Sequence, residues 1–250
     1  MLKKSKFIFD FATNFGSNIV ILLLGIVGSM LTTRYLGPEG MGSFTIITTF
    51  SLLFVSLAEL GIRQSSIYFI AKDKSLANDV LSSNFFIWIA SSIIGISLYF
   101  VLLDHKEIEL PWLWILIGSL VIPSSIANTF INGIMVGVDK ISKNATFNFT
   151  NSLFKISITV LFVVILQWSV IGALLALIIP TTTVIFRKYF YLNKVENLKL
   201  KFTLDWQLIK QLLLQGFLYA IALFLMTNQK QIPVFVMSGI IEKKILVFME

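Results

Sequence analysis

Residues 15–34 read FGSNIVILLLGIVGSMLTTR, an apolar run with no charge before Arg34 at its end. A transmembrane helix needs about 20 predominantly apolar residues, so this run has the length of one membrane span. Further runs of this kind follow at residues 44–62, 83–103, 111–135, 149–167 and 169–187. Another run starts near Gly216 and loses its apolar character by Asn228. The sequence therefore predicts an all-α membrane protein with a six-helix transmembrane lobe and the start of a seventh span.

The composition argues against a soluble enzyme. Hydrophobic residues make up 56% of the 250-residue chain and charged residues 13%, whereas soluble domains carry about 25% charged residues. The chain has no Cys, its one His is His105, and no His, Asp or Glu cluster has the spacing of a metal site. No phosphate-binding loop or nucleophile elbow is present. We therefore expect no enzymatic activity, no cofactor and no metal.

The basic residues define a topology. The net charge is +7, but Lys and Arg concentrate at the N-terminus and in alternate links, while the intervening links hold only Arg34 and Lys106. Basic links face the cytoplasm in multi-pass proteins, so the N-terminus is predicted to be cytoplasmic, in the cell (cytoplasmic or inner) membrane. This distribution does not favour nucleic acid as a partner. The basic residues of the predicted cytoplasmic segments are Lys3, Lys4, Lys6, Arg63, Lys72, Lys74, Lys140, Lys143, Arg187, Lys188, Lys194, Lys199, Lys201 and Lys210.

Residues 1–190 are predicted to form the six-helix lobe, 191–215 a cytoplasmic amphipathic link, and 216–250 an incomplete seventh span with a divergent tail. The amphipathic segment 63–84 is expected to form a short helix at the cytoplasmic surface. Pro123 and Pro180 fall inside predicted spans, where each is expected to kink or locally open its helix.

Polar side chains follow one face of two predicted helices. Asn144, Asn148, Asn151 and Lys155 are spaced by four, three and four residues, and Ser124, Asn128 and Asn132 by four. In one interpretation these faces line a hydrated cavity in which Lys155 and Arg34 attract an anion. In the other, the Asn residues join helices, Arg34 is an interfacial anchor and the Lys155 ammonium reaches the headgroups. Small residues four apart on the first span, at Gly25 with Ser29 and Gly28 with Thr32, are expected to permit close helix packing.

Three segments resemble a known family. TTRYLGPEGMG at 32–42, AELGI at 58–62 and IYFIAKDK at 67–74 are similar to motifs of the polysaccharide (O-antigen-type) flippases. These belong to the multidrug/oligosaccharidyl-lipid/polysaccharide exporter superfamily. The resemblance implies two six-helix lobes around a cationic cavity, and translocation of a polyprenyl-pyrophosphate-linked oligosaccharide from the cytoplasmic to the outer leaflet. The cavity candidates are then Arg34, Lys155, Asn128, Asn132, Asn148 and Asn151.

Members of this family normally have twelve or more spans, so we expect this chain to represent the N-terminal half, as a truncated or frameshifted member. Its expected partners are membrane lipid, the lipid-linked oligosaccharide, and a second lobe or other polysaccharide-assembly proteins. Half of a cation-coupled multidrug exporter is an alternative; it calls for buried carboxylates, and only Glu59 qualifies. A non-transporting membrane subunit is a further alternative.

Overall fold

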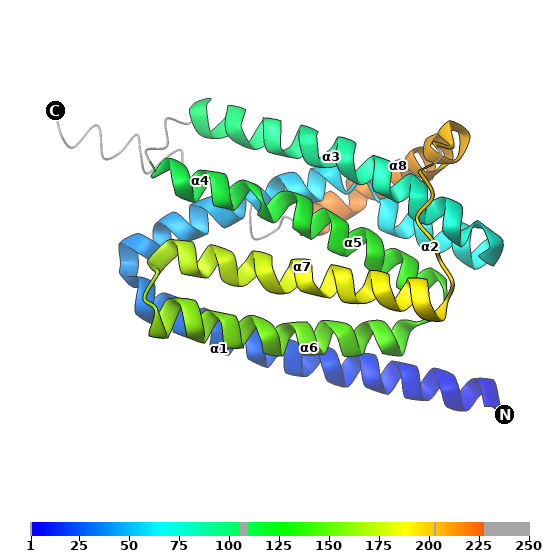
Figure 1. Ribbon diagram of the computed structural model, residues 1–250, viewed down its shortest axis with the longest axis horizontal. Helices are drawn as coiled ribbons and strands as arrows, with labels where there is room; N and C mark the ends of the chain where they lie inside the picture. Colours follow the sequence, from blue (N-terminus) through cyan, green and yellow to red (C-terminus); the bar gives the residue numbers. More distant parts are fainter. Residues whose placement is uncertain (1, 106–109, 203, 228–250) are drawn as a thin grey trace.

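The computed structural model describes residues 2–105, 110–202 and 204–227, with side-chain surroundings between residues 15 and 220. Every regular element in these ranges is a helix, and the long helices lie side by side in one bundle (Figure 1). The α-helices are α1 (Leu2–Ala58), α2 (Ile62–Lys72), α3 (Ala77–His105), α4 (Trp112–Ser119), α5 (Val121–Gly137), α6 (Ile141–Thr159), α7 (Ser169–Val195) and α8 (Trp206–Thr227). A 3-10 turn (Lys74–Leu76) precedes α3, and a π-helical segment (Val160–Ile165) continues α6. The predicted all-helical membrane fold is confirmed.

The first two predicted spans are the two arms of α1. Gly37 interrupts the helix with φ 69° and ψ −178°, a conformation that glycine tolerates and other residues rarely adopt. Pro38 follows, and its fixed φ suits the first position of the second arm. Figure 1 shows α1 running from the N-terminus to the opposite end of the bundle and back. Of the described residues, five helical stretches are long and apolar enough to cross a membrane, and α1 with α2 counts as one of them.

The predicted interruption at Pro123 is confirmed. The fourth span is broken into α4 and α5 at Leu120, because Pro123 has no N–H to donate one turn back. The Trp88 indole N–H donates to the Pro123 carbonyl at 2.8 Å and the Ser51 hydroxyl donates to the Gly118 carbonyl at 3.0 Å, which fix the break in place.

Pro180 does not open its helix, and the alternative expectation of a kink there stays a prediction. The α7 helix passes through the buried Pro180 without a break. The hydroxyls of Thr181, Thr182 and Thr183 each donate to the carbonyl four residues earlier, at 2.7–2.8 Å. These bonds satisfy hydroxyls that would otherwise be unpaired in an apolar bundle.

The segment 63–84 is also corrected. Its first part is α2, but its second part belongs to α3, and α2 packs within the bundle instead of lying on its surface. Ser65 and Ser66 are completely buried. A Cβ on Gly133 or Gly137 of α5 would lie 2.9 Å from α2 atoms, so the absence of side chains there lets the two helices approach closely.

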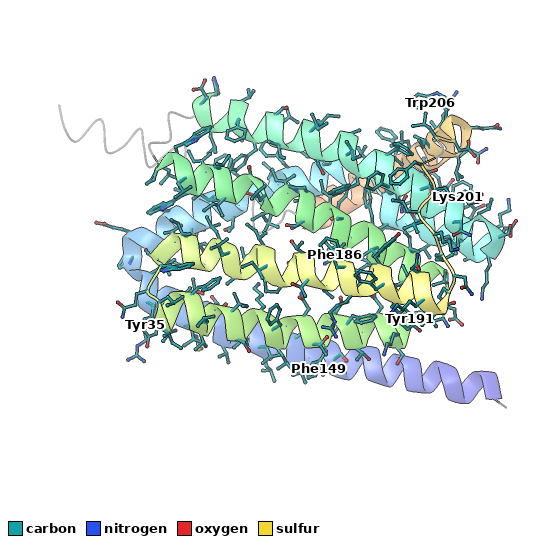
Figure 2. All side chains as sticks on the ribbon, viewed as in Figure 1. Tyr35, Phe149, Phe186, Tyr191, Lys201 and Trp206 are labelled. Carbon is teal, nitrogen blue, oxygen red and sulfur yellow. The ribbon has the colours of Figure 1, made fainter. Side chains whose placement is uncertain are left out.

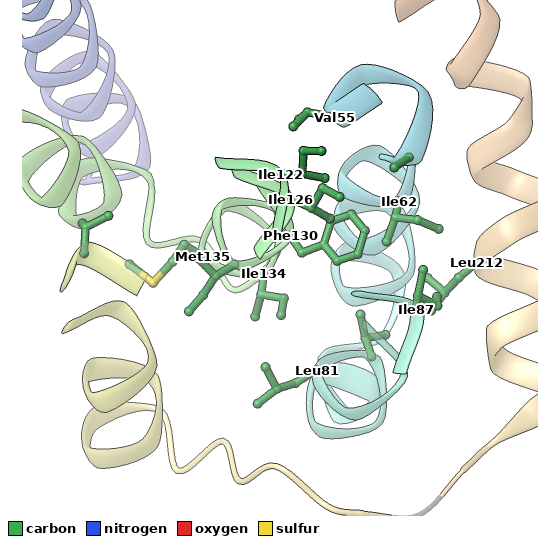
Figure 3. Packing of buried hydrophobic residues seen from close by; sticks show 14 of the residues in the cluster. Val55, Ile62, Leu81, Ile87, Ile122, Ile126, Phe130, Ile134, Met135 and Leu212 are labelled. Atoms are coloured by element: carbon green, nitrogen blue, oxygen red, sulfur yellow. The ribbon is translucent and has the colours of Figure 1, made fainter. Parts of the chain in front are cut away.

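The main apolar core surrounds α5. Its residues Ile122, Ile126, Phe130 and Ile134 are buried against the second arm of α1, α2 and α3 (Figure 3). The helix expected to start near Gly216 starts at Trp206 as α8, and its Leu208, Ile209 and Leu212 join this core. The predicted tail after residue 227 lies outside the described residues. The domain division given above stays a prediction.

The links at 73–76, 138–140 and 196–205 lie with the N-terminus at one end of the bundle, which we call the N-terminal end (Figure 1). The Gly37 turn and the link at 166–168 lie at the other end. The basic links therefore share one end, as the charge pattern predicts. That this end faces the cytoplasm remains a prediction.

Candidate functional site

Lys188 of α7 is completely buried, with 0% of its surface exposed. Its ammonium donates to the side-chain oxygens of Asn132 on α5 and Asn148 on α6, the latter at 2.7 Å, and approaches that of Asn128 at 3.5 Å. An ammonium has three N–H donors and no acceptor, so three amide oxygens match it in number. We call Lys188 with these three Asn residues the lysine cage.

The lysine cage holds a cation among neutral oxygens. The ion pairs found within the described residues join Lys140 to Glu196 and Lys201 to Asp79, and neither involves Lys188. The carboxylate of Glu59 accepts a bond from Thr129 at 2.7 Å instead. A buried charge without a counter-charge is costly, so ionisable residues retained inside membrane spans usually have a functional role.

Lys188 is not among the predicted site residues, because the apolar run of the sixth span ends at residue 187. A usable signal was present. Pro180, Val184, Lys188 and Leu192 follow each other at intervals of four, and all are buried on one face of α7. This spacing places Lys188 on the packed face of a longer helix.

The polar stripes predicted from Asn spacing do meet. The structure brings Asn128 and Asn132 to Asn148, around a lysine that was not foreseen. Asn151 lies further along α6, and its side-chain oxygen is buried without a hydrogen-bond partner among the described residues. Whether any of these residues contacts a substrate stays a prediction.

A cavity of about 250 Å³ lies between the two arms of α1, α6 and α7. Lys155 lines it together with Ser29, Thr32 and Thr159. Lys155 keeps more than a third of its surface exposed, and no side-chain hydrogen bond or ion pair holds its ammonium within the described ranges. The cavity thus offers one free cation beside hydroxyls and apolar walls.

Arg34 does not line the cavity that contains Lys155. It is exposed and lies three residues before Gly37, and Thr32 is the last residue of the first α1 arm that lines the cavity. Figure 2 labels its neighbour Tyr35 at the Gly37 end of the bundle, whereas Tyr191, shortly after Lys188, lies at the N-terminal end. Arg34 and the lysine cage are therefore separated along the bundle.

The small residues of the first span have a different role from the one expected. A Cβ on Gly25 would meet nothing within 4 Å, and one on Gly28 would meet only Ile156 Cγ1 at 4.0 Å. Both glycines line the cavity. The prediction of close packing at Gly25 and Gly28 is wrong, because their missing side chains leave space that no neighbouring helix fills.

Comparisons with known proteins agree with this architecture. The family described as polysaccharide biosynthesis protein matches residues 10–246, nearly the whole chain. A sequence comparison with curated proteins gives no significant match.

The fold matches solved transporters of the MOP superfamily. An outward-facing multidrug resistance MATE family transporter has a TM-score of 0.63 and 15% identity, over 85% of this chain and 51% of the transporter. A MOP superfamily transporter from Pyrococcus furiosus, described as having a binding pocket of reverse polarity, has a TM-score of 0.61 and 15% identity, over 86% and 52% of the two chains. This chain therefore spans about half the length of the transporters it matches. It belongs to the polysaccharide biosynthesis protein family and has the fold of one half of a MATE-type transporter.

Proposed function

We propose that this chain forms one lobe of a transporter that moves a polyprenyl-pyrophosphate-linked oligosaccharide from the cytoplasmic to the outer leaflet. Family membership supports a role in polysaccharide assembly, and the half-transporter fold supports translocation. The observation that carries the substrate class is the ammonium of Lys155 in the cavity between α1, α6 and α7.

The lining of this cavity suits the linker of such a lipid. A lysine ammonium is a compact positive charge that binds phosphate oxygens. The hydroxyls of Thr32 and Thr159 donate to carbonyls on their own helices, at 2.8 Å each, so the Lys155 ammonium is the donor that this lining offers to phosphate oxygens. The walls formed by Leu24 and Phe44 offer apolar contact to a prenyl chain.

The size of the cavity limits what it holds. About 250 Å³ is below the usual range for drug-sized ligands, so a phosphate-sized group fits and an oligosaccharide does not. The sugar would need the space between this lobe and a second one, supplied by another part of the protein or by a partner. A second lobe is therefore part of the proposal.

The test is export of surface polysaccharide in a strain that lacks its flippase and expresses this chain with its second lobe. Lys155→Ala is expected to abolish export at normal protein level. Lys210→Ala, on the exposed side of α8, is the matched control and should export normally. Normal export by Lys155→Ala would remove Lys155 from substrate binding.

Half of a cation-coupled multidrug exporter is the second candidate. The MATE neighbours favour it, as does the carboxylate of Glu59 held by Thr129 inside the bundle. In this case Glu59→Gln should raise drug accumulation in expressing cells, with no change in surface polysaccharide. Unchanged drug accumulation with a loss of surface polysaccharide would favour the flippase.

A further inference from the structure

We propose that the lysine cage is a proton-binding site, in which the proton on Lys188 is the exchangeable cation of the lobe. The site stands on its own geometry; its coupling to transport rests on the proposed function. Lys188 is fully buried, and the partners of its ammonium are amide oxygens from α5 and α6.

The surroundings select the ligand. The side-chain atoms that contact the ammonium are amide oxygens, so its N–H donors are directed to neutral acceptors and are not left for an anion. A metal cation would need the same oxygens, and the tethered ammonium already occupies them. A proton on the Lys188 nitrogen is therefore the cation that can leave and return.

Loss of this proton changes the bonding. One N–H bond breaks, the proton leaves, and its electron pair stays on the nitrogen as a lone pair. The neutral amine has two donors for three oxygens, and its lone pair faces an amide oxygen. One Asn must then turn its amide to donate an N–H, or α7 must shift relative to α5 and α6. Proton release thus weakens the bonds that hold α7 to its neighbours.

The charged residues around the lysine cage favour loss of the proton from Lys188. Arg63 of α2 packs against Gly133 of α5, next to Asn132 of the cage, and so brings a second positive charge to this part of the bundle. Glu59, in the turn between α1 and α2, accepts a hydrogen bond from Thr129, and Arg187 on α7 donates to Thr150 at 3.1 Å, so neither pairs with Lys188. Lys155 of α6 adds a further positive charge two turns beyond Asn148.

A polar route leads from the cage to the cavity. Along α6, Asn148 contacts Lys188, Asn151 has a buried oxygen without a partner in the described structure, and Lys155 lines the cavity. These residues are spaced by three and four, on one helix face. These polar side chains connect Lys188 to the proposed anion site, so anion binding and proton binding would influence each other.

The experiment follows Lys188 directly. The full chain is purified in lipid nanodiscs with ¹³Cε-labelled lysine, and the Lys188 signal is identified by its absence in Lys188→Met. Between acidic and alkaline pH, this signal should move from the ammonium to the amine position while the protein stays folded. Lys210→Met, which removes an exposed lysine, should leave the Lys188 titration unchanged. A Lys188 signal that stays at one position throughout would overturn the proposal.

A second measurement guards against misfolding of Lys188→Met. In Asn132→Leu, Lys188 remains but one oxygen of the cage is lost, so the midpoint of its titration should shift from that of the wild type. An unchanged midpoint would contradict the cage as the proton site. Neither readout needs a transported substrate, so a failure of the flippase proposal leaves both results interpretable.

Discussion

The backbone of Gly61, at the junction of α1 and α2, lies directly against the backbone of Gly216 in α8. A Cβ on Gly61 would be 2.1 Å from the Gly216 carbonyl oxygen, and a Cβ on Gly216 would be 2.4 Å from the Leu60 carbonyl oxygen. Gly61 also has φ 66°, in the left-handed region. The glycine of the AELGI motif therefore has a structural reason: it joins α8 to the end of the second α1 arm.

Gly61→Ala should lower the stability of the protein by about 1–3 kcal/mol. An alanine is strained at this φ, and its methyl group would clash with the Gly216 carbonyl oxygen. Thermal unfolding of the purified protein in detergent measures this. Gly42→Ala is the control, since a Cβ there meets nothing within 4 Å and φ is unremarkable. It should unfold at the wild-type temperature or slightly above it. Equal unfolding temperatures for both variants would contradict the Gly61–Gly216 contact.

Asn148→Leu should destabilise the protein and Asn151→Leu should not, although the two residues lie three apart on α6. Asn148 accepts a bond from the buried Lys188 ammonium, and losing a hydrogen bond to a buried charge costs about 1.5–3 kcal/mol. The Asn151 oxygen is buried without a partner within the described ranges, so a leucine there should be neutral or stabilising. Chemical or thermal denaturation of both variants measures the difference. Similar losses in both would argue against a special role for Asn148.

Filling the cavity should stop transport without unfolding the lobe. Gly25→Leu places a side chain where a Cβ meets nothing within 4 Å, and it removes a glycine from a helix interior, which favours the folded state. The variant should express and unfold like the wild type and lose polysaccharide export. Gly16→Leu, also in open space but outside the cavity lining, is the matched control and should export normally. Export by Gly25→Leu would mean that the cavity is not used.

The apolar runs were sufficient to predict the membrane-spanning helices, because a run of about 20 apolar residues is stable in lipid as a helix. They were not sufficient to place helix ends. Helices α3, α6 and α7 continue past their apolar runs at the N-terminal end, and these extensions contain polar and charged residues that the hydropathy pattern does not assign to a span. For this reason Lys188 was counted as a link residue.

Helix-to-helix contacts were the other limit. The spacing of Asn128 and Asn132 predicted a shared face correctly, but spacing within one helix does not show which residue of another helix faces it. Likewise, Gly25 and Gly133 look alike in the sequence. One borders empty space and the other lies against the Arg63 backbone, since only the packing of the bundle separates a gap from a contact.

Lys140 and Glu196 form an ion pair at 2.7 Å that joins the link before α6 to the end of α7. The hydrogen bond to Glu196 raises the pKa of Lys140 above its usual value. A lysine whose pKa is higher in the folded state contributes stability that is fully present below its unfolded pKa and is lost as the pH rises through its folded pKa. Glu196→Gln should therefore lower stability at neutral pH by less than about 1 kcal/mol, because both side chains are partly exposed.

The difference between wild type and Glu196→Gln should shrink at strongly alkaline pH and in high salt, where the Lys140 charge is lost or screened. Unfolding curves at several pH values measure this. Asp79→Asn is a suitable comparison, because its pair with Lys201 is longer, at 3.6 Å, and more exposed. It should have a smaller effect at every pH. A Glu196→Gln difference that persists undiminished at alkaline pH would show that Glu196 stabilises the α7 end through packing and not through the charge of Lys140.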